Sequence, residues 1–80
     1  MKIKILLFGI ATDLLATSAL DFEVSKRCSV RDLKNNLLLK YPQLKKIQSY
    51  AIAVNEAYAN EEDVLKENDI VAIIPPVSGG

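Results

Sequence analysis

The sequence contains no histidine, and Cys28 is its only cysteine. One cysteine cannot form a disulfide within the chain, and without histidine no Cys/His zinc site can be assembled. A Ser-His or Cys-His catalytic pair is excluded for the same reason. These absences remove most self-contained hydrolytic chemistry, so in any reaction the chain is expected to act as a substrate, a carrier or a subunit.

The chain also lacks an excess of charge and a long apolar run. Ten Lys and Arg balance ten Asp and Glu, so no surplus of positive charge is available for nucleic-acid phosphates. The longest run without charge, residues 70–80, contains two prolines and is too short to span a membrane. The apolar residues 5–11 are soon followed by Asp13, so we expect a strand there rather than a signal peptide. We expect no nucleic-acid or membrane partner and a cytoplasmic location, in keeping with the free thiol.

What remains is the composition of one small globular domain. Half of the 80 residues are hydrophobic and 25% are charged. Alternating apolar residues predict strands over residues 2–8, 21–25 and 50–54, and the first two are expected to form a hairpin with a long turn. Residues 70–74 are uniformly apolar and predict a central strand, which ends at Pro75 because proline cannot donate to a sheet ladder.

The main helix is expected between the second and third strands. Ser29 followed by Asp32 makes a capping box, although Glu or Gln is preferred at the later position. Apolar residues then recur at three- and four-residue steps as far as Tyr41, and the following proline ends the helix. One main helix packed on a mixed sheet of four or five strands is an α+β roll.

Three further segments have less specific signals. A short helix is expected within residues 11–19 with Thr12 as its cap, and a single helical turn in residues 61–65 with Asn60 as its cap. The acidic residues that open this turn are interpreted as a solvated helix start rather than a cation site. Cys28 is interpreted as a small packing residue rather than a group that handles sulfur.

The C-terminal segment is the most unusual part of the sequence. It leaves an apolar strand through a proline pair, which favours an extended conformation, and it ends in two glycines, which fit channels too narrow for side chains. We therefore predict a domain over residues 1–75 and a flexible tail over residues 76–80 that presents its carboxylate to another protein. Adenylation by ATP would turn this carboxylate into a reactive acyl phosphate, which a sulfur nucleophile or an amine can attack. The residues expected to enter the partner are Pro75, at the end of the domain, and Pro76, Val77, Ser78 and Gly79 of the tail, with Gly80 carrying the reacting carboxylate.

Several motifs resemble the MoaD family, the small subunit of molybdopterin synthase. They are the run Val54-Asn55-Glu56, the segment LKENDIVAIIPPVSGG at residues 65–80, the opening LLFG at residues 6–9 and the helix start SVRDL at residues 29–33. The resemblance covers essentially the whole chain. It implies a ubiquitin-like β-grasp fold, which agrees with the predicted order of elements.

The resemblance also implies a sulfur carrier. Gly80 is expected to be adenylated by a MoeB-type enzyme and converted to a thiocarboxylate, which then donates sulfur to a pyranopterin precursor in the active site of the large synthase subunit. The chain would be a non-catalytic donor subunit of a hetero-tetramer, with no bound cofactor and no metal. Phe8, Tyr58 and Ile74 resemble the apolar face on which the family binds its partner; for Phe8 and Ile74, core packing is the alternative interpretation.

Other functions remain open at this point. The same activation of the tail would serve a thiamine-type sulfur carrier or a ubiquitin-like modifier of protein lysines. Thiamine-type carriers are usually shorter and lack the PPVSGG ending. A third possibility is a β-grasp binding module with an inert tail. The chain departs from the family pattern at Ala16, where glycine is common, and at Thr12 and Asp13, where a basic residue often stands.

Overall fold

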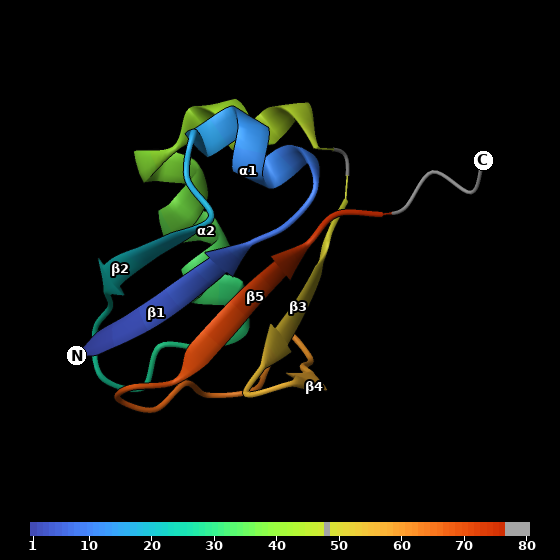
Figure 1. Cartoon of the computed structure of the whole chain (residues 1–80). Coiled ribbons are helices and arrows are strands. Elements are labelled where there is room, and N and C mark those ends of the chain that lie inside the picture. The colour runs from blue at the N-terminus through green and yellow to red at the C-terminus, as the bar shows by residue number, and fades with distance from the viewer. Residues whose placement is uncertain (48, 77–80) are drawn as a thin grey trace.

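The fold combines a mixed five-stranded sheet with one main helix (Figure 1). The computed structural model describes residues 1–47 and 49–76. This architecture confirms the predicted α+β class. In chain order the elements are β1 (Lys2–Leu7), α1 (Ile10–Leu15), β2 (Ala19–Glu23), α2 (Val30–Lys40), the 3₁₀ helix η1 (Pro42–Lys46), β3 (Ala51–Val54), β4 (Ala57–Tyr58) and β5 (Ile70–Ile74).

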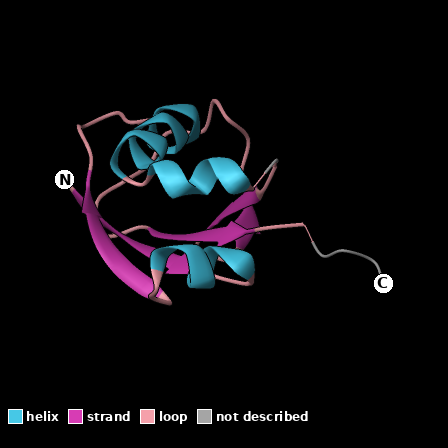
Figure 2. Ribbon diagram, turned by 90° about the horizontal axis from the view of Figure 1, so that it is seen from above, coloured by secondary structure: helices cyan, strands magenta, loops and turns pink. Residues whose placement is uncertain are grey.

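The strands are ordered β2-β1-β5-β3-β4. β1 and β5 run parallel, and every other neighbouring pair is antiparallel. The opening hairpin is confirmed, since β1 pairs with β2 in the register that places Ile3 opposite Phe22. β5 lies between β1 and β3 and is the central strand that its uniformly apolar sequence predicts. In Figure 2 the strands form a curved layer, with helical segments above and below it in that view.

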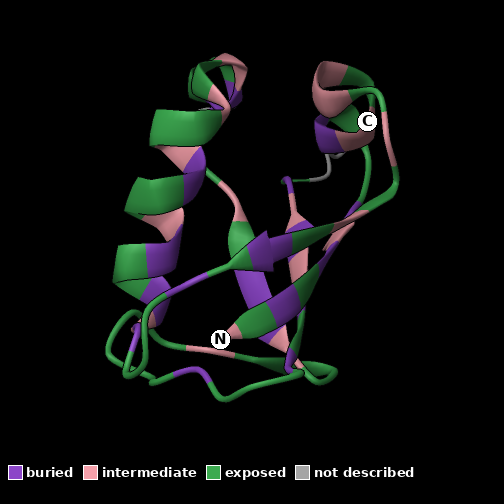
Figure 3. Ribbon diagram, turned by 90° about the vertical axis from the view of Figure 1, so that its left-hand side faces the viewer, coloured by how far each residue is buried: buried purple, intermediate pink, exposed green. Residues whose placement is uncertain are grey.

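The core lies between the sheet and α2 (Figure 3). Alternation along each strand turns every second side chain toward the helix, and these residues are almost fully buried. α2 contributes one apolar stripe, because its buried residues are spaced at three and four positions. Burying each such aliphatic side chain stabilises the fold by about 1.5–3 kcal/mol. The central members are Ile3, Ile5 and Leu7 of β1, Val30, Leu33 and Leu37 of α2, and Val71 and Ile73 of β5.

The start of α2 is fixed by hydrogen bonds from two directions. The Ser29 hydroxyl accepts the Asp32 N–H at 3.1 Å, and the Asp32 carboxylate accepts the Ser29 N–H at 3.3 Å, so the predicted capping box is confirmed. The N–H groups of Val30 and Arg31 donate to carbonyl oxygens in the loop of residues 61–63. These first-turn donors have no partner inside a helix, so this loop completes the cap.

The first short helix differs from its prediction. α1 spans Ile10–Leu15 rather than residues 11–19, because β2 already begins at Ala19. Thr12 is not its cap: its hydroxyl donates to the Leu7 carbonyl oxygen at 2.9 Å. The residue before the helix is Gly9, whose φ of +56° is a conformation that suits glycine.

The prediction for the second short segment, residues 61–65, is also wrong. Residues 61 and 62 form a turn, Val64 forms an isolated bridge with Ser29, and no residue of the segment 61–65 is helical. The Asp63 carboxylate accepts the Asn60 N–H at 2.8 Å, so the capping side chain is Asp63 and not Asn60. The 3₁₀ helix η1 was not predicted; it starts at the proline that ends the longer helix and buries Leu44 against the core.

Candidate functional site

The face of the sheet opposite α2 carries an apolar hollow of about 310 Å³. Its lining residues come from β1, β3, β4, β5 and the adjoining turns, and they include all three of the residues proposed for partner binding. Phe8 is 48% exposed and Tyr58 is 78% exposed, while Ile74 is half-buried. Neither Phe8 nor Ile74 belongs to the buried core, so the alternative interpretation as core packing is wrong. The hollow is lined by Leu6, Phe8, Ala53, Glu56, Tyr58, Ile70, Ala72 and Ile74.

Tyr58 reaches this face through a tight hairpin. Asn55 and Glu56 form the two-residue turn between β3 and β4, both with positive φ, which is the geometry of a type I′ turn. The register then places Tyr58 opposite Ala53. Because β4 has only two residues, its position depends strongly on this turn.

The turn is fastened to the start of β5 by the side chain of Asn55. Its amide donates to the Asp69 carboxylate at 2.9 Å, and its amide oxygen accepts the Ile70 N–H at 3.0 Å. The other carboxylate oxygen of Asp69 accepts the Lys66 N–H at 2.8 Å. Asp69 is a buried acidic residue with both oxygens hydrogen-bonded, as a charge in that position requires. These bonds hold one wall of the hollow in place.

The base of the C-terminal tail adjoins the same hollow. Ile74 lines it, and the next residue, Pro75, is buried beside Gly9. A Cβ atom placed on Gly9 would lie 3.7 Å from Cγ of Pro75, so the turn after β1 supports the point at which the chain leaves the sheet. Pro76 is exposed. The remaining tail residues of the prediction, Val77, Ser78, Gly79 and Gly80, lie outside the described residues, so the boundary between residues 75 and 76 stays a prediction.

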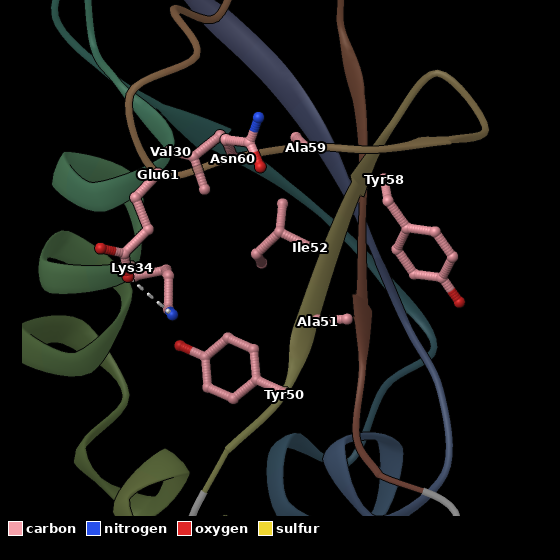
Figure 4. A pocket seen from close by; sticks show the side chains of 9 residues that line it. All are labelled: Val30, Lys34, Tyr50, Ala51, Ile52, Tyr58, Ala59, Asn60 and Glu61. Atoms are coloured by element: carbon pink, nitrogen blue, oxygen red, sulfur yellow. Dashed lines mark hydrogen bonds and ion pairs between the residues drawn. The ribbon is translucent and has the colours of Figure 1, made fainter.

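A second, more polar pocket of about 270 Å³ opens between α2 and the β3–β4 side of the sheet (Figure 4). Lys34 Nζ lies 3.3 Å from the Glu61 carboxylate and 5.2 Å from the centre of the Tyr50 ring. Figure 4 shows Tyr58 on the other side of β3 from Lys34 and Tyr50, in keeping with its place on the open face.

The charged side chains at this second pocket form ion pairs with one another. Hydrogen bonds from Lys34 and then Arg31 lower the pKa of Glu61, so this carboxylate stays ionised. Burial raises the pKa of the Tyr50 hydroxyl, so Tyr50 stays neutral and is no base. The pocket therefore ties the 61–63 loop to α2 and offers no activated nucleophile.

Cys28 is buried at the start of α2. Burial raises the pKa of its thiol, and the negative charge of Asp32 raises it further. The thiolate is the reactive form of cysteine, so this environment favours the packing interpretation over a role in handling sulfur.

Neither metal binding nor a membrane span is supported by the part of the chain that the structure describes. No group of three Cys, Asp or Glu side chains in residues 1–47 and 49–76 is placed to hold a metal ion. No helix in those ranges is long and apolar enough to cross a membrane.

Three of the residues that line the hollow on β1 and β5 were not predicted. Leu6, Ile70 and Ala72 lie on the same face as Phe8 and Ile74 because alternate residues of one strand share a face. That signal was available in the alternation of β1 and β5. Glu56 was recognised as a turn residue, but its place at the rim of the hollow follows from the pairing of β3 with β4.

Comparisons with known proteins place this chain in a family. The ThiS family matches residues 5–80. The molybdopterin synthase sulfur carrier subunit of Arabidopsis thaliana is 33% identical over all of this chain and 84% of that protein. The protein of the same name from Mycobacterium tuberculosis is 35% identical over all of this chain and 99% of its own length.

Solved structures agree with the fold. A putative molybdopterin converting factor, subunit 1, from Pyrococcus furiosus is 26% identical with a TM-score of 0.87, over 96% of this chain and 99% of that chain. Small archaeal modifier protein 1 of Methanosarcina acetivorans is 28% identical with a TM-score of 0.81, over 99% and 96%. A complex of subunits 1 and 2 of molybdopterin-converting factor from Helicobacter pylori contains a chain with a TM-score of 0.71 and 24% identity, over all of both chains. These ubiquitin-like neighbours confirm the β-grasp fold.

Proposed function

Because the chain belongs to the ThiS family, we propose that it is the sulfur carrier subunit of a molybdopterin synthase. The observation that carries this proposal is the continuity between the hollow and the tail. β5 ends at Ile74 in the wall of the hollow, and the next residues are the proline pair that leads to Gly79 and Gly80. A partner seated on the hollow is therefore positioned to receive the tail.

The chemistry takes place at the carboxylate of Gly80. A MoeB-type enzyme joins this carboxylate to the α-phosphate of ATP, and pyrophosphate leaves. A sulfur nucleophile then attacks the acyl carbon, and AMP leaves, so that the carboxylate becomes a thiocarboxylate. Enclosing this group in a partner limits its hydrolysis.

The thiocarboxylate sulfur is the nucleophile that passes to the pyranopterin precursor. The large subunit supplies the side chains for this transfer, and this chain supplies the sulfur and the binding surface. The assembly is a hetero-tetramer of small and large subunits, located in the cytoplasm. Support for a large-subunit partner comes from the Helicobacter pylori structure, in which subunits 1 and 2 form a complex.

A second candidate function is a ubiquitin-like modifier, in which a protein lysine takes the acyl group of Gly80. The similarity to small archaeal modifier protein 1 of Methanosarcina acetivorans favours it. A thiamine-type carrier uses the same activation, but the relatives that match the whole chain are named as molybdopterin synthase subunits. The acceptor of the activated group distinguishes all three functions.

The test is the intact mass of the chain after incubation with ATP, the adenylating enzyme and a sulfur donor. We expect a gain equal to the replacement of one oxygen by sulfur, localised to Gly80. A matched variant with one residue added after Gly80 should keep its fold and show no gain, because its carboxylate no longer follows the Gly-Gly pair.

The charged carrier is then offered to the large subunit with its precursor and, separately, to a protein lysine acceptor. Return of the carrier to its original mass together with a sulfur-containing pterin supports the synthase role. A covalent conjugate supports the modifier role. No mass change, with the enzyme active on another carrier, would contradict both.

A further inference from the structure

Glu56 is the one acidic residue among the side chains that line the apolar hollow. It stands at the rim beside Tyr58, and it is exposed. Among the described residues, no lysine or arginine forms an ion pair with it; the ion pairs found there join Arg31 and Lys34 to Glu61 and Glu62. Its charge is therefore available to a molecule that covers the hollow.

The backbone at Glu56 adopts a conformation that residues with a side chain tolerate poorly. Its φ is +73°, at the second position of a type I′ turn, where glycine is favoured because it has no Cβ. A glutamate in this position lowers the stability of the fold and contributes no intramolecular ion pair in the described part of the chain. Backbone strain that is retained in this way is found preferentially at functional positions.

Hydrogen bonds from Asn55 hold the backbone of this turn in place. Asn55, the first turn residue, is bonded to Asp69 and to Ile70 through its side chain, and its backbone N–H donates to the Ile70 carbonyl oxygen at 2.8 Å. These contacts fix the direction in which the Glu56 side chain leaves the turn. The base of the Glu56 side chain is thus fixed beside the hollow, within reach of a molecule that covers it.

We propose that Glu56 forms an ion pair with a lysine or arginine of the large subunit, and that this pair selects the partner whose apolar surface fills the hollow. The inference rests on the proposed function, in which the large subunit covers this face. The complementary surface consists of an apolar projection facing Leu6, Phe8 and Ile74 with one cationic side chain beside it. A charge at the rim of an interface acts mainly on association rate, salt dependence and choice of partner.

The test measures binding of the full chain to the large subunit by calorimetry. E56Q should weaken binding about fivefold, and E56K about thirtyfold, since like charges facing each other are unfavourable. At about 1 M salt, where the screening length is about 3 Å, the affinities of wild type and E56Q should converge.

The deciding variant is E56G, because it separates affinity from stability. Glycine accepts the positive φ, so E56G should raise the midpoint of thermal unfolding by about 4 °C while it weakens binding as E56Q does. The matched control is A16G: Ala16 has a φ of +57° but lies outside the hollow. It should raise the midpoint similarly and leave the affinity unchanged.

Equal affinity and equal salt dependence of E56Q and wild type would overturn the ion pair and leave the proposed function standing. A loss of both stability and affinity in E56G would also overturn it, because the weaker binding would then reflect a disturbed hairpin. If the wild-type chain fails to bind the large subunit under any salt condition, the ion pair and the proposed function both fall.

Discussion

Ile73 and Ile74 are neighbours of the same residue type in β5, and they lie on opposite faces of the sheet. Ile73 is fully buried beneath α2, whereas Ile74 is half-buried in the wall of the apolar hollow. The same alternation separates Leu7, in the core, from Leu6, in the hollow. The apolar residues of this sheet therefore have two different environments: those of one face stabilise the domain, and those of the other form the surface that we propose for partner binding.

The difference arises from what covers each face. α2 lays an apolar stripe across the inner face. The outer face is open at the hollow, whose lining side chains include the exposed Phe8 and Tyr58. A contiguous exposed apolar surface on a small domain is typical of an interaction site. Mutations on the two faces should therefore change different measured quantities.

The largest expected effect is on the inner face. Ile73→Ala removes three carbon atoms from a fully buried position and leaves a cavity, so the free energy of unfolding should fall by about 3 kcal/mol. Urea denaturation followed by circular dichroism measures this loss. The matched variant Ile74→Ala should lose about 1 kcal/mol or less, because its side chain is already partly exposed.

In a binding measurement the order of the two effects should be reversed, with Ile74→Ala having the larger one. Ile74→Ala should weaken binding to the large subunit, whereas Ile73→Ala, measured at a temperature where it remains folded, should bind as the wild type does. A stronger loss of affinity in Ile73→Ala than in Ile74→Ala would contradict the division of the sheet into two faces.

The outer face is tested further by Phe8→Ser. Phe8 is 48% exposed, so its loss should change the free energy of unfolding by less than about 1 kcal/mol. In the complex its ring is expected to be enclosed, and truncating a buried aromatic at an interface typically costs at least about 2 kcal/mol of binding. We expect the dissociation constant to rise about thirtyfold, as measured by calorimetry.

Leu39→Ser is the matched control for Phe8→Ser. Leu39 is 83% exposed on α2, away from the hollow. This variant therefore removes an apolar side chain that is even more exposed than Phe8, without changing the open face. Its affinity for the large subunit should equal that of the wild type. Equal losses in the two variants would indicate a general effect of surface polarity and would contradict a specific binding face.

The sequence predicted the inner face of the sheet well because that face depends on local periodicity. Alternation in β1 places Ile3 and Ile5 in the core, and the apolar spacing of α2 was read correctly. The capping box at Ser29 was also predictable, since its two partners are three residues apart. At these positions the local sequence pattern and the tertiary structure favour the same residues, so the pattern predicts the structure.

The prediction failed where the local signal and the tertiary contacts differ. Thr12 has the residue type of a cap, but its hydroxyl donates to the carbonyl of Leu7, and the helix starts after Gly9. At Glu56 and Ala16 the backbone adopts positive φ without the glycine that normally marks it. The hollow itself needs β1, β5, β3 and β4 in that order across the sheet, which no single segment encodes.

The smallest expected effect calibrates the comparison, because it changes stability on the helix side without touching the open face. Ser29→Ala removes the hydroxyl that accepts the Asp32 N–H, and loss of such a cap costs about 1 kcal/mol in the free energy of unfolding. Ser29→Thr keeps an oxygen in the capping position and should retain most of this stability, which urea denaturation can resolve. Because Ser29 lies outside the hollow, both variants should bind the large subunit as the wild type does. A weaker complex with Ser29→Ala would mean that the stability of α2 controls the shape of the open face, and the two faces would then have to be treated as one coupled unit.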